Sequence, residues 1–190
     1  MKLPVTTLSR ALRPFPVQLS LPLHWGELDA AGSINTLYFA KFFEAGRRSY
    51  YLQVLKPQVS PSSYASFAAP TTIGPILKSC QFEFFTPVPF DGPGSRLEIG
   101  TRIKTLLADR FVWELVVLSN SPRLLQASES TSAPASAADG YVLVARGEAV
   151  SVMFDYSLHK KALVPSDIAD AIRTAEQSDV QQRADQRAGE

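Results

Sequence analysis

The chain has 190 residues, of which 45% are hydrophobic and 19% are charged. This size and mixture are typical of one globular domain and exclude a wholly disordered or fibrous chain. The 19 basic and 18 acidic side chains give a formal net charge of +1, whereas a nucleic-acid-binding domain usually carries a clear basic excess. Cys80 is the single cysteine, so an intrachain disulfide framework and a thiolate metal cluster are excluded.

The N-terminal segment, residues 1–14, is basic and apolar. No acidic residue precedes Glu27, and lysine and arginine are interspersed with leucine and valine. Two interpretations remain open: a flexible segment at the start of a cytoplasmic protein, which we favour, or a transit peptide for mitochondrial import. The longest uncharged stretch, residues 57–77, is interrupted by several prolines, so we expect no membrane-spanning helix.

The first two elements are a strand and a long helix. The stretch Val17–Trp25 alternates apolar with polar residues, which predicts a half-buried strand. A helical pattern follows over about Asn35–Leu55, with Asn35 or Ser33 as its N-cap. Its first half is apolar on nearly all sides, as in a helix buried within a domain. Gly46 costs about 1 kcal/mol there relative to alanine, so we expect another backbone to approach it closely.

The remaining strands are predicted to surround this helix. They alternate in polarity or are rich in β-branched and aromatic residues, and proline- and glycine-containing turns separate them. We expect them over Lys78–Thr86, Arg96–Leu106, Phe111–Leu118 and Tyr141–Phe154. Antiparallel strands curled around one early helix make an α+β domain, which we place at residues 15–175. A short helix over Ser166–Ala175 is expected to lead into a disordered tail, residues 176–190.

Two smaller features lie within or beside the predicted strands. Residues 121–140, between the last two strands, are mostly small and polar over their second half. Such a stretch cannot bury enough apolar area to offset the entropy of ordering, so we expect a mobile low-complexity insertion. Cys80 falls on the apolar phase of its strand, which predicts a buried and unreactive thiol.

The residue patterns of most catalytic and metal-binding sites are absent from this sequence. His24 and His159 have no partner at metal-ligand spacing, and serine-hydrolase and phosphate-loop motifs are absent. We therefore expect no metal and no cofactor. What remains is Asp29, between the first strand and the N-terminus of the long helix. Unpaired N–H groups there can polarise a carbonyl oxygen, and Asp29 can attack the carbonyl or activate water. Alternatively, Asp29 only caps the turn or complements the helix dipole.

These residues resemble the signature of the 4-hydroxybenzoyl-CoA thioesterase-like family of hotdog-fold acyl-CoA thioesterases. The family pattern is Asp-x-x-Gly-His-x-Asn-Asn, then a tyrosine, then Glu-x-x-Arg on the central helix. Asp29, Gly32 and Asn35 match its first part. Glu44 and Arg47 match the helix pair without a gap. The resemblance implies the hotdog fold, in which an antiparallel sheet wraps around one long central helix.

The resemblance also implies a reaction and roles for residues. The reaction is hydrolysis of an acyl-CoA or acyl-carrier-protein thioester, typical of lipid metabolism, to a carboxylic acid and a thiol. Asp29 would be the nucleophile or general base, and backbone N–H groups from Gly32 to Asn35 would hold the oxyanion. The positions expected to line the oxyanion and substrate site are Gly32, Ser33, Asn35, Thr36 and Phe39. Glu44 and Arg47 would form a structural ion pair.

The family's site lies between two subunits, so a homodimer or homotetramer is implied. Basic candidates for the CoA phosphates are Lys160, Lys161, Arg102 and Lys104, although a solvated charged surface is the favoured interpretation of each.

The sequence departs from the family pattern at three positions, which keeps alternatives open. Ser33 replaces the usual His, Thr36 the second Asn, and Phe39 stands at the aromatic position. The main alternative is a catalytically silent hotdog protein that binds an acyl group or serves as an assembly subunit. A hotdog hydratase or dehydratase ranks lower, because such enzymes usually need a histidine with an acidic partner and no suitable one follows Asp29.

Overall fold

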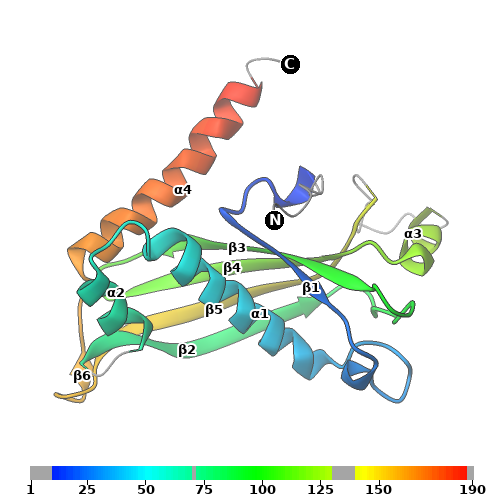
Figure 1. Ribbon diagram of the computed structural model, residues 1–190, viewed down its shortest axis with the longest axis horizontal. Coiled ribbons are helices and arrows are strands. Elements are labelled where there is room, and N and C mark those ends of the chain that lie inside the picture. The colour runs from blue at the N-terminus through cyan, green and yellow to red at the C-terminus, as the bar shows by residue number, and fades with distance from the viewer. Residues whose placement is uncertain (1–9, 70–71, 130–139, 188–190) are drawn as a thin grey trace.

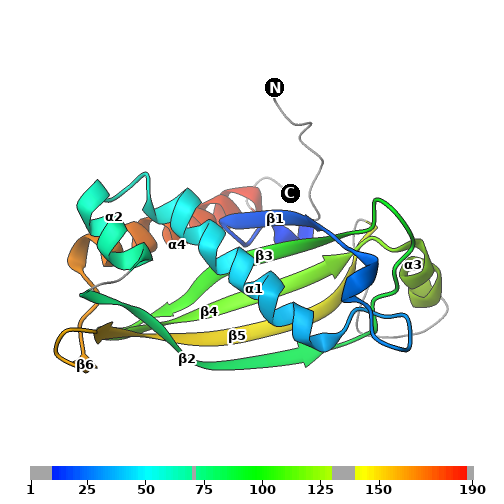
Figure 2. The same cartoon turned by 60° about the horizontal axis from the view of Figure 1, so that its bottom comes forward.

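The computed structural model describes residues 10–69, 72–129 and 140–187. A six-stranded antiparallel sheet curls around the long helix α1 (Figures 1 and 2). The strands are β1 (Val17–Pro22), β2 (Ile73–Phe84), β3 (Arg96–Leu106), β4 (Arg110–Ser119), β5 (Val142–Asp155) and β6 (Lys160–Lys161). Their order is β1-β3-β4-β5-β2, and β6 pairs with β5. This is the predicted α+β hotdog architecture.

Seven helical segments accompany the sheet in the described residues. They are η1 (Arg10–Leu12), η2 (Trp25–Glu27), α1 (Thr36–Tyr50), η3 (Tyr51–Leu55), α2 (Pro61–Ala68), α3 (Pro122–Glu129) and α4 (Ser166–Arg187). Helix α1 crosses the concave face of the sheet, whereas α4 runs outward from the body (Figure 1). None of the helices over the described residues combines the length and apolar content that a bilayer crossing needs.

Helix α1 is buried on one face only. Phe39, Phe42, Phe43 and Tyr50 lie against the sheet, but Leu37 on the opposite face is 78% exposed. The expectation of a helix buried on all sides is therefore wrong for a single chain, because the sheet covers just one side of it. The predicted close approach at Gly46 is present, but the neighbours are side chains of the sheet and not, as expected, another backbone.

The fit at Gly46 sets the distance between α1 and β3. A Cβ atom on Gly46 would lie 2.3 Å from Oγ1 of Thr101 and 3.2 Å from Cδ2 of Leu115. A side chain larger than hydrogen at this position would require either the helix or the Thr101 side chain to shift. Gly46 therefore fixes where α1 lies on the sheet.

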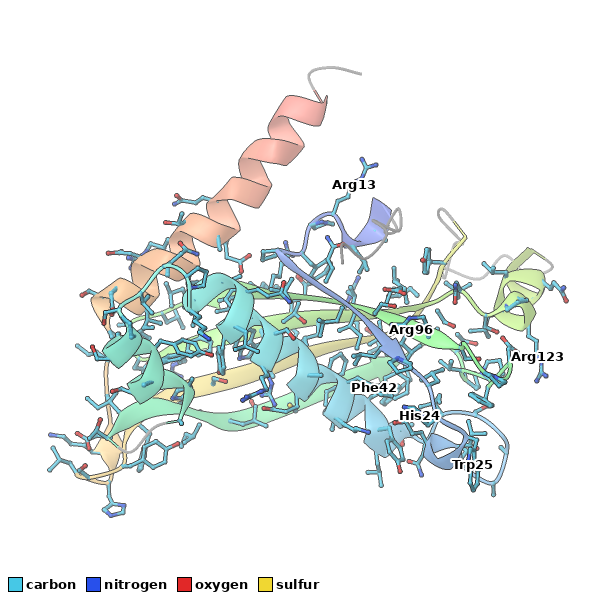
Figure 3. The ribbon with its side chains drawn as sticks, viewed as in Figure 1. Arg13, His24, Trp25, Phe42, Arg96 and Arg123 are labelled. Carbon is cyan, nitrogen blue, oxygen red and sulfur yellow. The ribbon has the colours of Figure 1, made fainter. Side chains whose placement is uncertain are left out.

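Strand β1 is shorter than its alternating pattern predicts. It ends at Pro22, which has no N–H to donate, and Trp25 is 78% exposed instead of lying on the apolar face. Trp25 opens the turn η2, in which the backbone N–H of His24 donates to Oε2 of Glu27 at 3.0 Å. His24 and Trp25 lie beside the N-terminal end of α1 (Figure 3).

Strand β2 forms an edge of the sheet and is longer than predicted. It begins at Ile73 and includes Pro75, which an edge strand tolerates. Cys80 is exposed, not buried as expected, because no described strand covers this edge.

The sequence reasoning missed α2, although Ser60 and Pro61 are its N-cap and first residue and form a helix-start signal.

The described part of the N-terminal segment is packed, not flexible. Leu12 and Phe15 form a small apolar cluster with Val116 and Leu118 on the outer face of the sheet. A Cβ atom on Gly100 would lie 2.7 Å from the ring of Phe15, so this glycine makes room for the segment. Residues 1–9, which include most of the candidate transit peptide, lie outside the described residues.

Two predicted irregular segments contain helix. Within residues 121–140, Pro122–Glu129 forms α3, anchored by buried Leu124, and 130–139 lie outside the described residues. Helix α4 continues to Arg187, well into the expected tail. Oε1 of Glu176 accepts hydrogen bonds from the Tyr50 hydroxyl and the Ile103 N–H, both at 2.8 Å. These bonds tie α4 to α1 and β3 at a residue beyond Ala175. The sequence there is polar and shows no apolar periodicity, so it gave no indication that the helix continues.

Candidate active site

A tight loop connects β1 to α1 and contains Asp29. The Asp29 N–H donates to the Ser33 carbonyl at 2.7 Å, and the Gly32 N–H donates to the Asp29 carbonyl at 3.1 Å. Gly32 has a φ of +76°, the left-handed region that glycine adopts without strain. The loop is held against the segment after β2, because the Ile34 N–H donates to the Val88 carbonyl at 2.8 Å.

The two carboxylate oxygens of Asp29 have different surroundings. Oδ1 accepts hydrogen bonds from the N–H groups of Ala31, at 2.9 Å, and Ser33, at 3.1 Å. Oδ2 has no hydrogen-bond partner among the described residues. The loop therefore orients the carboxylate through one oxygen and leaves the other free. The alternative interpretation, in which Asp29 only caps the turn, accounts for Oδ1 but not for Oδ2.

Helix α1 begins beside this carboxylate. Of the two predicted candidates, Asn35 and not Ser33 is its N-cap, and Oδ1 of Asn35 accepts from the Leu37 N–H at 3.0 Å. The Asn35 N–H donates to the Glu27 carbonyl at 2.9 Å. The N–H groups of residues 32–35, expected as oxyanion donors, are thus all hydrogen-bonded within the loop or to its neighbours. Among the described residues, the first unpaired N–H at the helix start is that of Thr36.

The carboxylate and the helix start share one cavity of about 260 Å³. Its polar wall consists of Asp29, Ser33 and Thr36. Its apolar wall comes from α1, from the end of β2 and from the segment after it. The apolar-wall residues are Ile34, Phe39, Phe84, Phe85, Pro87 and Val88, and Thr86 lies among them. A carbonyl bound in this cavity would therefore lie near both Asp29 and the start of α1.

Comparison with known proteins identifies the family of this chain. Residues 23–172 match the family model described as the thioesterase-like superfamily. The chain belongs to that superfamily. No curated protein matches the sequence at a significant level.

Solved structures share the fold of this thioesterase-like protein at low sequence identity. A Pseudomonas aeruginosa protein has a TM-score of 0.61 and 17% identity, over 87% of this chain and 94% of that one. A thioesterase from Thermus thermophilus, complexed with coenzyme A and Zn, has a TM-score of 0.59 and 20% identity over 86% and 96%. An Asp-to-Asn mutant of 4-hydroxybenzoyl-CoA thioesterase, complexed with 4-hydroxybenzoyl-CoA, has 0.61 and 19% over 82% and 97%.

The structure brings four of the predicted site residues of this superfamily member into one cavity. Asp29, Ser33, Thr36 and Phe39 line it, whereas Gly32 and Asn35 shape the loop and the helix start behind it. The sequence reasoning missed the contribution of residues 84–88. The proline after the predicted second strand was a signal, because it ends the strand where the cavity begins.

Glu27 is a positioning residue that the sequence reasoning also missed. It is buried, and its two carboxylate oxygens accept from the His24 N–H, at 3.0 Å, and from Nζ of Lys41, at 3.1 Å. Through its carbonyl it also accepts from the Asn35 N–H. Glu27 therefore joins η2, the N-cap and the side of α1. Its position three residues after His24 matches the spacing of a capping box.

Glu44 and Arg47 form an ion pair on α1, away from Asp29. They line a second cavity of about 220 Å³, together with Tyr51, Phe67, Pro75 and Leu77. Glu44 is largely exposed, whereas Arg47 is buried and its Nε atom has no hydrogen-bond partner. Burial raises the pKa of the Tyr51 phenol far above its ordinary value, so its hydroxyl stays protonated. This pair does not contact the Asp29 cavity.

The candidate phosphate-binding cations lie away from the Asp29 cavity. Lys160 and Lys161 are in β6, at the opposite end of the sheet (Figure 1). Arg102 and Lys104 pair with Glu114 and Glu148. Over the part of the chain that the structure describes, no three His, Cys, Asp or Glu side chains converge to hold a metal ion.

Proposed function

We propose that this protein hydrolyses an acyl thioester, of coenzyme A or of an acyl-carrier protein, to a free carboxylic acid and a thiol. The observation that carries the proposal is that Asp29, whose carboxylate keeps one oxygen free of hydrogen bonds, and Thr36, at the start of α1, line the same cavity. Membership of the thioesterase-like superfamily supports the reaction class. The solved relatives with coenzyme A or an acyl-CoA bound support the thioester as substrate.

In the proposed reaction, Asp29 supplies the base or the nucleophile. As a base, Oδ2 accepts a proton from water while the water oxygen bonds to the thioester carbonyl carbon; the C–S bond then breaks and the sulfur leaves as the thiol. As a nucleophile, Oδ2 bonds to that carbon first; the C–S bond then breaks, and the sulfur leaves as a thiolate that takes a proton from water. Water hydrolyses the resulting anhydride to the carboxylic acid and restores the Asp29 carboxylate. In both routes the Thr36 N–H and the positive end of α1 stabilise the oxyanion.

We also propose that the working unit is a homodimer formed through the free edge of β2. This strand pairs with β5 on one side only, and it presents the exposed apolar residues Ile73, Leu77 and Phe84. A second copy pairing here would continue the sheet across the two chains and satisfy the unpaired backbone groups of β2. It would also cover Phe84, which lines the Asp29 cavity, and so complete the wall on that side. A homotetramer would add further contacts between such dimers.

The reaction is tested by thiol release from acyl-CoAs and acyl-carrier-protein thioesters. We expect release by the wild type and a loss of at least about 100-fold in kcat/KM for Asp29→Asn, since acid–base groups contribute roughly that much or more. Asp155→Asn is the matched control, because Asp155 also caps a loop through Oδ1. An active Asp29→Asn enzyme would remove Asp29 from the mechanism. No release on any thioester would favour the silent binding protein.

The dimer is tested with the natural cysteine in β2. Because Cys80 is the chain's only cysteine, every crosslink between thiols must join two copies. We expect a short bismaleimide to give a covalent dimer in dilute solution, and sedimentation to give the mass of two chains. Leu77→Lys should prevent both by placing two like charges in the interface. A monomeric wild type that still releases thiol would overturn this part of the proposal.

A further inference from the structure

Aromatic rings bridge the groove between α1 and β2 in a regular order. The N-terminal end of α1 faces the C-terminal end of β2, so the two elements run in opposite directions along the groove. Phe39 meets Phe84 edge to face, with ring centres 5.0 Å apart. One turn further along α1, Phe43 stacks on Phe82 at 4.7 Å. We refer to these four phenylalanines as the aromatic wall.

Two cavities lie along α1 and β2, on either side of the inner pair of the aromatic wall. The Asp29 cavity lies on the side of Phe39 and Phe84, which form part of its lining. The second cavity lies further along α1, where Arg47 and Tyr51 face the beginning of β2. The order of contacts along α1 and β2 therefore places the Phe43–Phe82 pair between the two cavities.

The inner rings of the wall are held in the close-packed core. Phe39 and Phe43 are almost fully buried, and Phe39 also packs against Phe42 with ring centres 5.9 Å apart. A Cβ atom on Gly147 of β5 would lie 2.9 Å from the Phe43 ring and 3.0 Å from the Phe82 ring. The rings thus rest directly on the backbone of the sheet. A side chain packed in this way cannot move aside without displacing its neighbours.

The cavity beyond the wall is unsuitable for the end of an acyl chain. It contains the Glu44–Arg47 ion pair, and a buried Nε of Arg47 that lacks a hydrogen-bond partner. Methylene groups gain binding free energy when they leave water for apolar surroundings, and they gain little beside an ion pair that must keep its own solvation. Even a chain that passed the wall would therefore not bind more tightly for its extra length.

We infer that the acyl group taken by this protein is short, and that the aromatic wall sets its limit. This inference rests on the proposed function, because it identifies the Asp29 cavity as the acyl site. Phe82 and Phe84 are then specificity-determining residues that touch the end of the acyl group or support the ring that does. Long-chain acyl thioesters are excluded as good substrates by the same geometry.

The experiment measures binding of S-alkyl-CoA thioethers, which cannot be hydrolysed, from ethyl to hexadecyl by calorimetry on the full chain. Each methylene that the cavity buries should tighten binding about fourfold, since it contributes about 0.8 kcal/mol. For the wild type we expect this gain to stop before the octyl compound. A wild-type affinity that rises steadily to hexadecyl would overturn the inference, as would the absence of binding by every member.

Three variants test the wall itself. Phe82→Ala and Phe84→Ala should move the chain length at which the gain stops to longer compounds, and Phe84→Leu should do so to a smaller extent while preserving packing. Phe154→Ala is the control, because Phe154 is a partly buried phenylalanine at the other end of the sheet. Unchanged profiles in folded Phe82 and Phe84 variants would refute the wall. An early limit in thioether binding without thiol release from any thioester would refute the proposed reaction and leave the acyl limit intact.

Discussion

Two loops of this protein hold an aspartate in nearly the same way, at opposite ends of the sheet. Oδ1 of Asp29 accepts from N–H groups two and four residues later. Oδ1 of Asp155 accepts from N–H groups two and three residues later, both at 2.9 Å. Each loop turns through a residue with positive φ, which is Gly32 at +76° in one and His159 at +51° in the other. Locally, the two carboxylates are close equivalents.

The difference lies in what each loop leads into. The Asp29 loop runs directly into α1, whose Thr36 and Phe39 line the same cavity together with residues 84–88. The Asp155 loop runs into β6, a strand of two residues. A capped carboxylate is therefore a common structural device, and it becomes a candidate catalytic group only where a helix N-terminus and an apolar wall are added. Substitutions in the helix and in each loop should separate these contributions.

Displacing α1 should have the largest effect on stability. Gly46→Ala places a methyl group against Oγ1 of Thr101, so we expect a loss of about 2 kcal/mol in the free energy of unfolding, the usual cost of overpacking. Chemical denaturation measures this loss. Amide exchange should accelerate at Ala31 and Ser33, in the Asp29 loop, and stay unchanged at the amides that cap Asp155.

The matched second variant is Thr101→Ala, alone and in combination. Its hydroxyl is buried without a hydrogen-bond partner, so its removal alone should cost little. In the double variant it should restore most of the stability that Gly46→Ala removes, since the closest contact is gone. Additive losses in the double variant would contradict the contact as the cause.

Sequence reasoning captured the parts of the fold that short-range patterns determine. Alternation located four of the strands to within a few residues, and the observed helix cap, Asn35, was one of the two predicted candidates. It failed where the burial of a residue depends on strand order. Cys80 alternates like a core residue but lies in an edge strand, and Trp25 continues an alternation after its strand has ended.

The candidate site shows the same limit. The motif brought Asp29, Ser33, Thr36 and Phe39 together, because they lie within one turn and the start of one helix. The apolar wall from residues 84–88 is distant in sequence and depends on how β2 packs against α1. The N–H groups that were predicted as oxyanion donors are occupied for a similar reason: hydrogen bonds to the carbonyls of Val88 and Glu27 use two of them.

Removing the helix cap should distinguish the loops at intermediate cost. Asn35→Ala leaves the Leu37 N–H without its side-chain acceptor, and we expect a loss of about 1 kcal/mol in the free energy of unfolding. Because the cap also places Thr36, kcat/KM for thiol release should fall, whereas Asn35→Asp should retain both stability and activity. Equal activity of the alanine and aspartate variants would show that the helix start is not used in the reaction.

The left-handed turn of the Asp29 loop can be tested without altering any contact. Nothing lies within 4 Å of a Cβ atom placed on Gly32, so Gly32→Ala introduces only backbone strain. With φ at +76°, this strain should lower the free energy of unfolding by about 1 kcal/mol. Thermal denaturation measures this loss. Gly140→Ala is the control, because Gly140 also has positive φ and open space around its Cβ position; comparing the two losses shows whether the turns at Gly32 and Gly140 differ in rigidity.

Introducing a glycine into the Asp155 loop should give the smallest effect on stability, and it should stabilise the protein instead of destabilising it. His159 adopts a φ of +51°, which is uncommon for a residue with a Cβ atom, and its ring makes only a distant edge contact with Phe154, 6.5 Å between centres. His159→Gly removes the strain but also increases the entropy of the unfolded chain. We therefore expect a net gain of about 0.5 kcal/mol in stability by thermal denaturation, with thiol release unchanged. A loss of activity in this variant would mean that the Asp155 loop, from this chain or from a second copy, reaches the site. The contrast between a purely structural loop and a candidate catalytic loop would then no longer hold.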